Sequence, residues 1–62
     1  MELTKYLNKK VQIILVNGFT YIGIVIDADD NSLILLDKNN SNVSLSDKVI
    51  TTIIELKGGK ET

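Results

Sequence analysis

The chain of 62 residues contains no cysteine and no histidine. Disulfide bonds are therefore excluded, and so are the usual zinc sites, which thiolates and imidazoles build. A domain of this size buries only about 60% of the surface that its unfolded form exposes, and small domains without cross-links often gain stability by oligomerising. The absence of cysteine is typical of a reducing compartment, so we expect a cytoplasmic protein.

The chain also lacks a long apolar run and an excess of positive charge. No segment approaches the roughly 18 apolar residues of a membrane span, and Lys5, Lys9 and Lys10 interrupt the amphipathic start, so neither a membrane segment nor a signal peptide is expected. The 7 basic and 8 acidic residues give a net charge of -1. Proteins that bind nucleic acid through phosphates alone are usually basic. A nucleic-acid role therefore requires a local basic patch, base contacts or charges brought together by assembly.

What the chain does have is a series of short apolar runs with strand-like alternation. The run Val11–Val16 ends in Asn17-Gly18, and a second run, Phe19–Asp27, starts at once. Asn-Gly between two such runs is a strong hairpin signal, because both residues accept the positive φ that a tight two-residue turn needs. Gly23 interrupts the second run, which predicts a bend or bulge at that position.

The remaining pattern completes a small β domain. Helical spacing predicts a short amphipathic helix over Glu2–Lys10. Further strands are predicted over residues 33–36, 43–45 and 49–56, separated by the turn cluster 29–32, the polar loop 38–42 and the tight connection 46–48. We therefore expect a mainly β fold: a short N-terminal helix followed by a strongly bent five-stranded antiparallel sheet, a small open barrel. Residues 1–56 form this single domain, and residues 57–62 are expected to be a flexible tail.

The last predicted strand is apolar on both faces. Strict alternation places Ile50, Ile54 and Leu56 on one face and Val49 and Ile53 on the other. A small barrel has room inside for only one face, and an uncovered apolar edge strand promotes aggregation. The cover is either the N-terminal helix and the curvature of the barrel, or the edge of a neighbouring subunit. Repeated head to tail, the second arrangement closes into a ring.

Together these features resemble the Sm-like superfamily, and within it the Hfq branch. The resemblance rests on the strand Val11–Leu15, the Asn17-Gly18 turn, the spacing from there to Gly23 and Asp29, and Ile50-Thr51-Thr52 in the last strand. It implies an open barrel of the Sm-like or SH3-like kind, capped by a helix. It implies hexameric or heptameric rings in which the fourth strand pairs with a neighbour's fifth. It also implies binding of U-rich or A-rich single-stranded RNA around the pore and on the ring faces.

The resemblance places Asp30, Asn31 and Lys48 on the pore side. An Asn amide can read a base edge as donor and acceptor, and Lys48 repeated around a ring would form a basic girdle. The alternative is ordinary turn chemistry for Asp30 and Asn31 and a solvated turn charge for Lys48. Where this chain has Asp30 and Asn31, the Hfq branch carries Gln and an aromatic residue, and where it has Ser46-Asp47-Lys48 that branch carries Tyr-Lys-His.

The resemblance places Phe19, Thr20 and Thr52 on the opposite face. Phe19 is a candidate for stacking on a base, which is worth about 1–3 kcal/mol per base. Tyr21 is expected in the core, and Ile22 replaces the polar residue with which the Hfq branch reads adenine.

Other positions have a rim or a structural interpretation. The basic cluster Lys5, Lys9 and Lys10 corresponds to the lateral rim of the ring, or is simply a solvated helix end. We interpret Gly18 and Gly23 as structural, and expect Asp29 to accept backbone hydrogen bonds in its turn.

These expectations favour an RNA-binding ring that acts as a chaperone or scaffold, in which weak sites repeated around the ring hold one strand at many points. The alternative is a ring-forming module that binds protein instead. We do not expect an enzyme, because histidine and cysteine are absent and Asp27, Asp29 and Asp30 are interpreted as turn residues and not as ligands of a divalent cation. No metal, cofactor or small-molecule substrate is expected.

Overall fold

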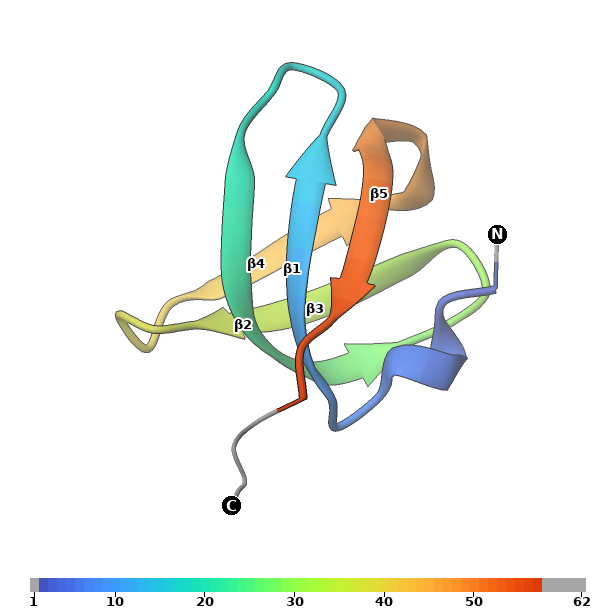
Figure 1. Ribbon diagram of the computed structural model, residues 1–62. Helices are drawn as coiled ribbons and strands as arrows, with labels where there is room; N and C mark the ends of the chain where they lie inside the picture. The colour runs from blue at the N-terminus through green and yellow to red at the C-terminus, as the bar shows by residue number, and fades with distance from the viewer. Residues whose placement is uncertain (1, 58–62) are drawn as a thin grey trace.

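The computed structural model describes residues 2–57, which form one five-stranded antiparallel sheet in the order β4-β3-β2-β1-β5 (Figure 1). Its elements are the 3-10 turn η1 (Thr4–Tyr6), β1 (Lys10–Leu15), β2 (Thr20–Ala28), β3 (Ser32–Asp37), β4 (Asn42–Ser46), the 3-10 turn η2 (Asp47–Val49) and β5 (Ile50–Glu55). The prediction of five antiparallel strands is confirmed. Strands β4 and β5 lie at opposite edges and do not pair with each other, so the sheet is not closed. The expected tail lies almost entirely outside the described residues.

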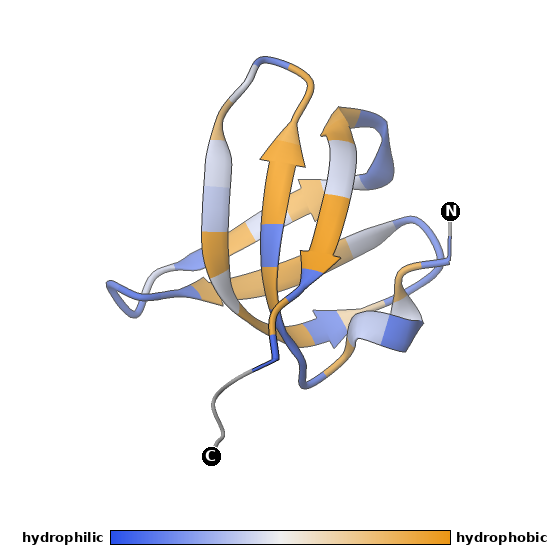
Figure 2. Cartoon of the chain, viewed as in Figure 1, coloured by the Kyte–Doolittle hydropathy of each residue, from blue (hydrophilic) through white to orange (hydrophobic). Residues whose placement is uncertain are grey.

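The core lies on the inner face of the bent sheet. Alternate residues of β1 and β3 are buried on the inner side. In Figure 2 hydrophobic colour predominates along these two strands and along the edge strand β5. The buried residues are Leu3, Val11, Ile13, Val25, Leu33, Leu35, Leu45 and Ile50. Tyr21 packs against this core, as expected from the sequence.

The predicted N-terminal helix over residues 2–10 is wrong. Only the 3-10 turn η1 forms, and Asn8 then takes a positive φ of 66°, which ends any helical path. The Asn8 N–H donates to the Val25 carbonyl at 2.7 Å, and the Val25 N–H donates to the Lys9 carbonyl at 3.1 Å. A helix this short is marginal alone, and here the segment instead buries Leu3 and continues along β2.

The β1–β2 hairpin has a longer loop than predicted. The Leu15 N–H donates to the Phe19 carbonyl at 2.8 Å, so residues 16–18 form the loop, and the Gly18 N–H closes a turn on the Leu15 carbonyl at 2.9 Å. Gly18 has a φ of 91°, whereas Asn17 does not have a positive φ. This is a turn closed by a left-handed glycine, and not the tight two-residue turn expected from Asn-Gly.

Gly23 is required for a close approach and does not mark the bulge in β2. A Cβ on Gly23 would collide with the Leu36 carbonyl oxygen and would lie 2.9 Å from the Asp37 Cα. The register of β2 against β3 shifts three residues later, between Val25 and Asp27, which leaves Ile26 as the extra residue. The sequence predicted a bend or bulge at Gly23, and the bulge lies three residues further along β2.

A second register shift corrects the predicted faces of the last strand. Ile14 pairs with Thr52 and Leu15 with Ile50, so Thr51 is extra. The extra residue reverses the alternation. Ile50 is therefore buried, on the same inner side as the half-buried Ile53, while Ile54 is 43% exposed.

Both edges of the sheet are open within residues 2–57. No described strand pairs with the outer edge of β4 or of β5. Residues 2–57 contain no helix that could span a lipid bilayer.

Candidate nucleic-acid interface

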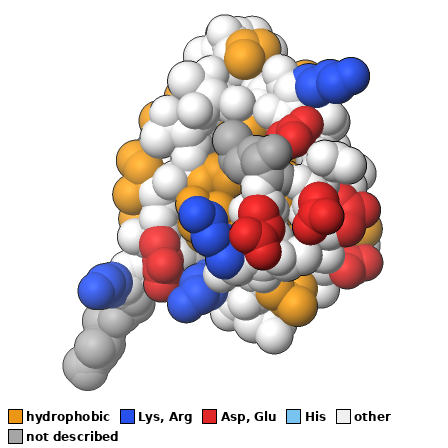
Figure 3. All heavy atoms as spheres, turned by 90° about the vertical axis from the view of Figure 1, so that its right-hand side faces the viewer, with side chains coloured by type: hydrophobic (Ala, Val, Ile, Leu, Met, Phe, Trp, Pro, Cys, Tyr) orange, Lys and Arg blue, Asp and Glu red, His pale blue; other side chains and the backbone are white. Residues whose placement is uncertain are grey.

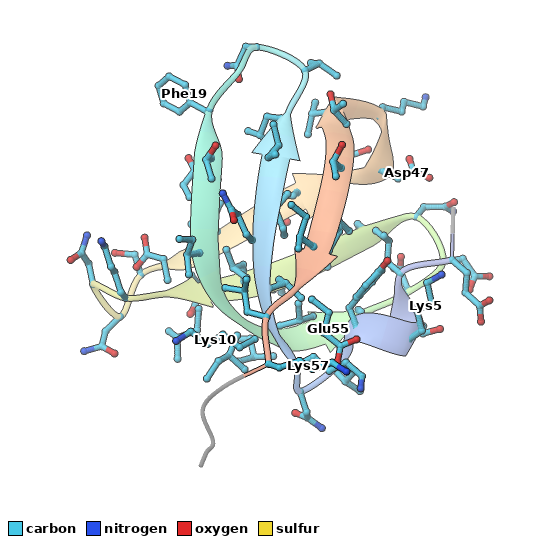
Figure 4. All side chains as sticks on the ribbon, viewed as in Figure 1. Lys5, Lys10, Phe19, Asp47, Glu55 and Lys57 are labelled. Carbon is cyan, nitrogen blue, oxygen red and sulfur yellow. The ribbon has the colours of Figure 1, made fainter. Side chains whose placement is uncertain are left out.

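The turn after β2 and the turn before β5 meet at one end of the sheet. The Asp47 N–H donates to the Asn31 carbonyl at 2.8 Å, and Ser32 pairs with Ser46 where β3 and β4 meet. Figure 4 shows Asp47 in the turn that precedes β5. Residues far apart in the sequence, Asn31 and Lys48, are thereby placed on adjoining turns. The pore-side residues proposed from the sequence thus share one region of the surface.

Asp29 holds the first of these turns together. Its Oδ1 accepts hydrogen bonds from the backbone N–H groups of Asn31 and Ser32, both at 2.8 Å, and from the Ser32 hydroxyl at 3.2 Å. These bonds, above all that from the Asn31 N–H, lower the pKa of Asp29 below its ordinary value. The structural role expected for Asp29 is present, and it leaves the Asn31 side-chain amide exposed and without a hydrogen-bond partner in residues 2–57.

Lys48 lies in a similarly fixed turn. Its backbone N–H donates to the Ser46 hydroxyl at 3.2 Å, which caps η2, and its side chain is exposed. The surroundings carry negative charge, because Asp29 and Asp30 precede Asn31 and Asp47 precedes Lys48. Figure 3 shows acidic side chains gathered on this side of the molecule, with lysine side chains beside them. The amide and the ammonium group are therefore available, but in a field that opposes phosphate.

The opposite candidate surface lies on the outer face of the hairpin. Thr20 and Thr52 both pair with Ile14, on its two sides, so they form one row across β2, β1 and β5. Phe19 is 63% exposed and Val16 66% exposed at the hairpin loop. Figure 4 shows Phe19 projecting away from the sheet. The structure thus brings Phe19, Thr20 and Thr52 to one exposed surface with an aromatic ring free to stack.

The three rim lysines do not share one environment. The Lys9 Nζ lies 3.3 Å from the Glu55 carboxylate. The Lys5 Nζ lies 5.4 Å from the centre of the Tyr6 ring, within cation–π range. Lys10 stands opposite Ile24 at the start of β1. The expected cluster is therefore divided among an ion pair, an aromatic contact and an outward-facing strand position.

Sequence reasoning missed a hollow on the outer face of the sheet. It measures about 320 Å³ and is lined by Lys10, Ile22, Gly23, Ile24, Leu36, Asp37, Lys38 and Asn40. The only advance signal was the outward position of Ile22 and Ile24 in the strand alternation. A smaller hollow of about 190 Å³ lies beside Asp27, Asp29 and Ser44. Within residues 2–57 no group of three or more metal-binding side chains comes together.

No model of a known protein family matches the chain, and no curated protein sequence matches it either. The function therefore has to be inferred from the fold and from the chemistry of these surfaces.

Proposed function

We propose that the protein is an Sm-like RNA-binding protein that assembles into a homo-oligomeric ring and holds single-stranded RNA as a chaperone or scaffold. The observation that carries this proposal is the open sheet, whose two edge strands, β4 and β5, both have an unpaired outer edge in residues 2–57. Unpaired edges are templates for pairing with another chain. A β4 edge joined to a neighbour's β5 edge is a heterologous contact, which closes into a ring if the rotation permits.

A ring would give the RNA contacts their strength. Each subunit would contribute the Asn31 amide and the Lys48 ammonium group on one side, and the Phe19 ring with Thr20 and Thr52 on the other. Each contact is weak alone. Repetition around a ring turns them into one multivalent site, because later contacts form at a high effective concentration.

The first test is size-exclusion chromatography with light scattering, on nuclease-treated and untreated protein, recording the 260/280 nm absorbance ratio. A hexamer- or heptamer-sized particle that carries nucleic acid is the expected result. A monomer of 6.9 kDa would remove both the edge pairing and the multivalent mechanism.

The second test measures the affinity of labelled U-rich and A-rich oligonucleotides by fluorescence anisotropy at several salt concentrations. Lys48→Ala should weaken binding and lower the salt dependence, because it removes one phosphate contact per subunit. Lys57→Ala is the matched control, since Lys57 is exposed and lies at the lower end of the view, away from Phe19 and Asp47 (Figure 4). Equal losses in the two variants would mean that general charge, and not this site, attracts RNA.

One observation favours a second candidate function, a ring-forming adaptor that binds protein. Asp29, Asp30 and Asp47 lie next to Asn31 and Lys48 in the two adjoining turns, and their charge suits a basic protein segment better than a phosphate backbone. A ring free of nucleic acid, together with no measurable oligonucleotide binding at low salt, would favour this function over the first.

A further inference from the structure

The hollow on the outer face combines an apolar floor with two positively charged groups. Lys10, Ile24 and Leu36 stand opposite one another on β1, β2 and β3, and Ile22 lies next along β2 on the same side. Ile22 and Ile24 are 39% and 45% exposed, whereas the inward residues beside them are buried or half-buried. Exposed isoleucines of this kind form an apolar patch, and covering the patch with a ligand lowers the free energy because apolar surface is removed from water.

The lysines of the hollow are free to bind an anion. Neither Lys10 nor Lys38 has an ion-pair partner within residues 2–57, unlike Lys9, which is paired with Glu55. The one carboxylate in the lining, Asp37, accepts the backbone N–H groups of Asn39 at 2.9 Å and Ser41 at 3.0 Å. That carboxylate is thus used to close the β3–β4 loop. Figure 4 shows Lys10 beside the lower part of β2, at the end of the sheet away from the hairpin loop.

The loop adds a group that can read a base. Asn40 takes a positive φ of 63°, and its N–H donates to the Asp37 carbonyl at 2.9 Å. Its place in the lining of the hollow puts a side-chain amide, both donor and acceptor, next to the apolar floor. The volume of about 320 Å³ is at the small end of the range for ligand sites, roughly 300–1,000 Å³.

We infer that this hollow binds a nucleoside monophosphate unit, either free or as one residue of an RNA strand. The base lies on Ile22, Ile24 and Leu36, the Asn40 amide meets its edge, and Lys10 and Lys38 bind the phosphate. An apolar body with an anionic end is the ligand chemistry that this combination of floor and charges complements. Binding of a nucleotide within an RNA strand rests on the proposed function, whereas binding of a free nucleotide does not.

The test is an NMR titration of ¹⁵N-labelled protein with AMP and with UMP at low salt. The expected result is a saturable shift of the backbone amides of Lys10, Ile24, Lys38 and Asn40. Lys10→Ala and Lys38→Ala should each weaken binding by about two- to fivefold, as expected for the loss of one exposed ion pair.

A matched pair of isoleucine variants tests the floor. Ile24→Glu places a carboxylate in the hollow and should abolish the shifts. Ile54→Glu makes the same change at an isoleucine that is 43% exposed and does not line the hollow, and it should leave them unchanged. Circular dichroism and the urea midpoint check that both variants fold. Equal effects of the two variants on AMP binding would overturn the inference.

Titration with inorganic phosphate alone separates the site from a simple anion site. If phosphate reproduces the shifts with the affinity of AMP, the base makes no contact and the inference is wrong. If no amide of the hollow shifts with either nucleotide up to millimolar concentrations, it is also wrong.

The last arm compares AMP with a short A-rich oligonucleotide and reads out the two surfaces separately. If Ile24→Glu loses affinity for the oligonucleotide, the natural ligand of the hollow is a nucleotide within an RNA strand. If Ile24→Glu loses AMP binding but keeps its affinity for the oligonucleotide, the ligand is a free nucleotide. An oligonucleotide that shifts only Asn31 and Lys48 overturns this inference and leaves the proposed function intact. If AMP shifts the amides of the hollow but no RNA binds, this inference stands and the proposed function is wrong.

Discussion

The two faces of β2 carry similar side chains and have different roles. On the inner face, Tyr21 and Val25 pack into the core, while on the outer face Ile22, Ile24 and Ile26 are 39%, 45% and 42% exposed. The inner residues are explained by folding, because burial of apolar surface stabilises the chain. The outer isoleucines contribute much less to folding. Their exposure on a domain this small is the observation from which we infer a ligand-binding hollow on this face.

The largest effect in this comparison is expected from placing a methyl group where the inner face of β2 meets β3. Gly23→Ala forces a Cβ into the Leu36 carbonyl and the Asp37 backbone, which cannot move without breaking the β2–β3 pairing. We expect a loss of about 3 kcal/mol or more, measured as the free energy of unfolding in urea.

Gly18→Ala is the matched control for that variant. Gly18 has a φ of 91° and no atom within 4 Å of an added Cβ, so only backbone strain of about 1–2 kcal/mol is expected. A larger loss for Gly18→Ala than for Gly23→Ala would contradict the close approach seen at Gly23.

The next largest effect is expected when an isoleucine is truncated to alanine on the inner face of the sheet and, for comparison, on the outer face. Ile13 is 0% exposed on the inner face and Ile24 is 45% exposed on the outer face. Ile13→Ala should cost about 2–5 kcal/mol because it leaves a cavity, while Ile24→Ala should cost less than about 1 kcal/mol. Thermal and urea unfolding of both variants measure this. Similar costs would mean that the outer isoleucines are buried, for instance in an assembly, and the measurement would then be repeated at several protein concentrations.

A smaller, pH-dependent effect is expected at Asp29, which stabilises its turn from an exposed position. Because the folded-state pKa is lowered below 3.8, the stabilisation is present above that pH and is lost as the pH falls through the folded pKa. Asp29→Asn should therefore lower Tm by a few degrees at neutral pH, and the difference from the unmodified chain should shrink below about pH 3.8. A difference that persists unchanged at pH 2 would show that charge is not involved.

The smallest effect belongs to the exposed ion pair between Lys9 and Glu55, whose side chains are 46% and 45% exposed at an N–O distance of 3.3 Å. Lys9→Ala should cost about 0.2–1 kcal/mol at low salt and less in 1 M salt, because solvent and ions screen exposed charges. Lys57→Ala serves as the comparison, since Lys57 has no ion-pair partner within residues 2–57. A salt-independent loss in Lys9→Ala would point to packing of its aliphatic stem instead.

Much of the fold followed from local patterns. Alternation located all five strands and grouped Val11 with Ile13 on one strand face, because successive strand residues point to opposite faces. Which face turns inward was not predicted and is seen only in the structure. Strict alternation failed in β5, where Thr51 is an extra residue. It placed Ile50 and Ile53 on opposite faces, whereas both lie on the inner side in the structure. A bulge is a response to pairing with a neighbouring strand, so the sequence of β5 alone carries no sign of it.

The N-terminal segment shows the same limit in a different way. Helical spacing of Leu3, Tyr6 and Leu7 predicted a helix, but tertiary contacts outweighed that weak preference. Leu3 is fully buried in the core, and the backbone of Asn8 and Lys9 forms hydrogen bonds with the backbone of Val25 in β2.

Of the candidate sites, one was predicted from local turn residues and one depends on the registers of several strands. Asp30, Asn31 and Lys48 were chosen from turn residues that the expected topology places together, and the hydrogen bond from Asp47 to Asn31 joins their turns. The hollow was not predicted, because it needs the registers of β1, β2 and β3 at once to align Lys10, Ile24 and Leu36.

The sequence by itself determined the number of strands, which residues of a strand share a face, and the turn built on Asp29, since each depends on residues close in the chain. Only the tertiary structure decided where the bulges fall, that the N-terminal segment is not helical, and which outer side chains lie together. The physical reason is that these features arise from pairing between segments far apart in the chain. Their free energies depend on how well neighbouring strands fit, and not on the preferences of any one segment.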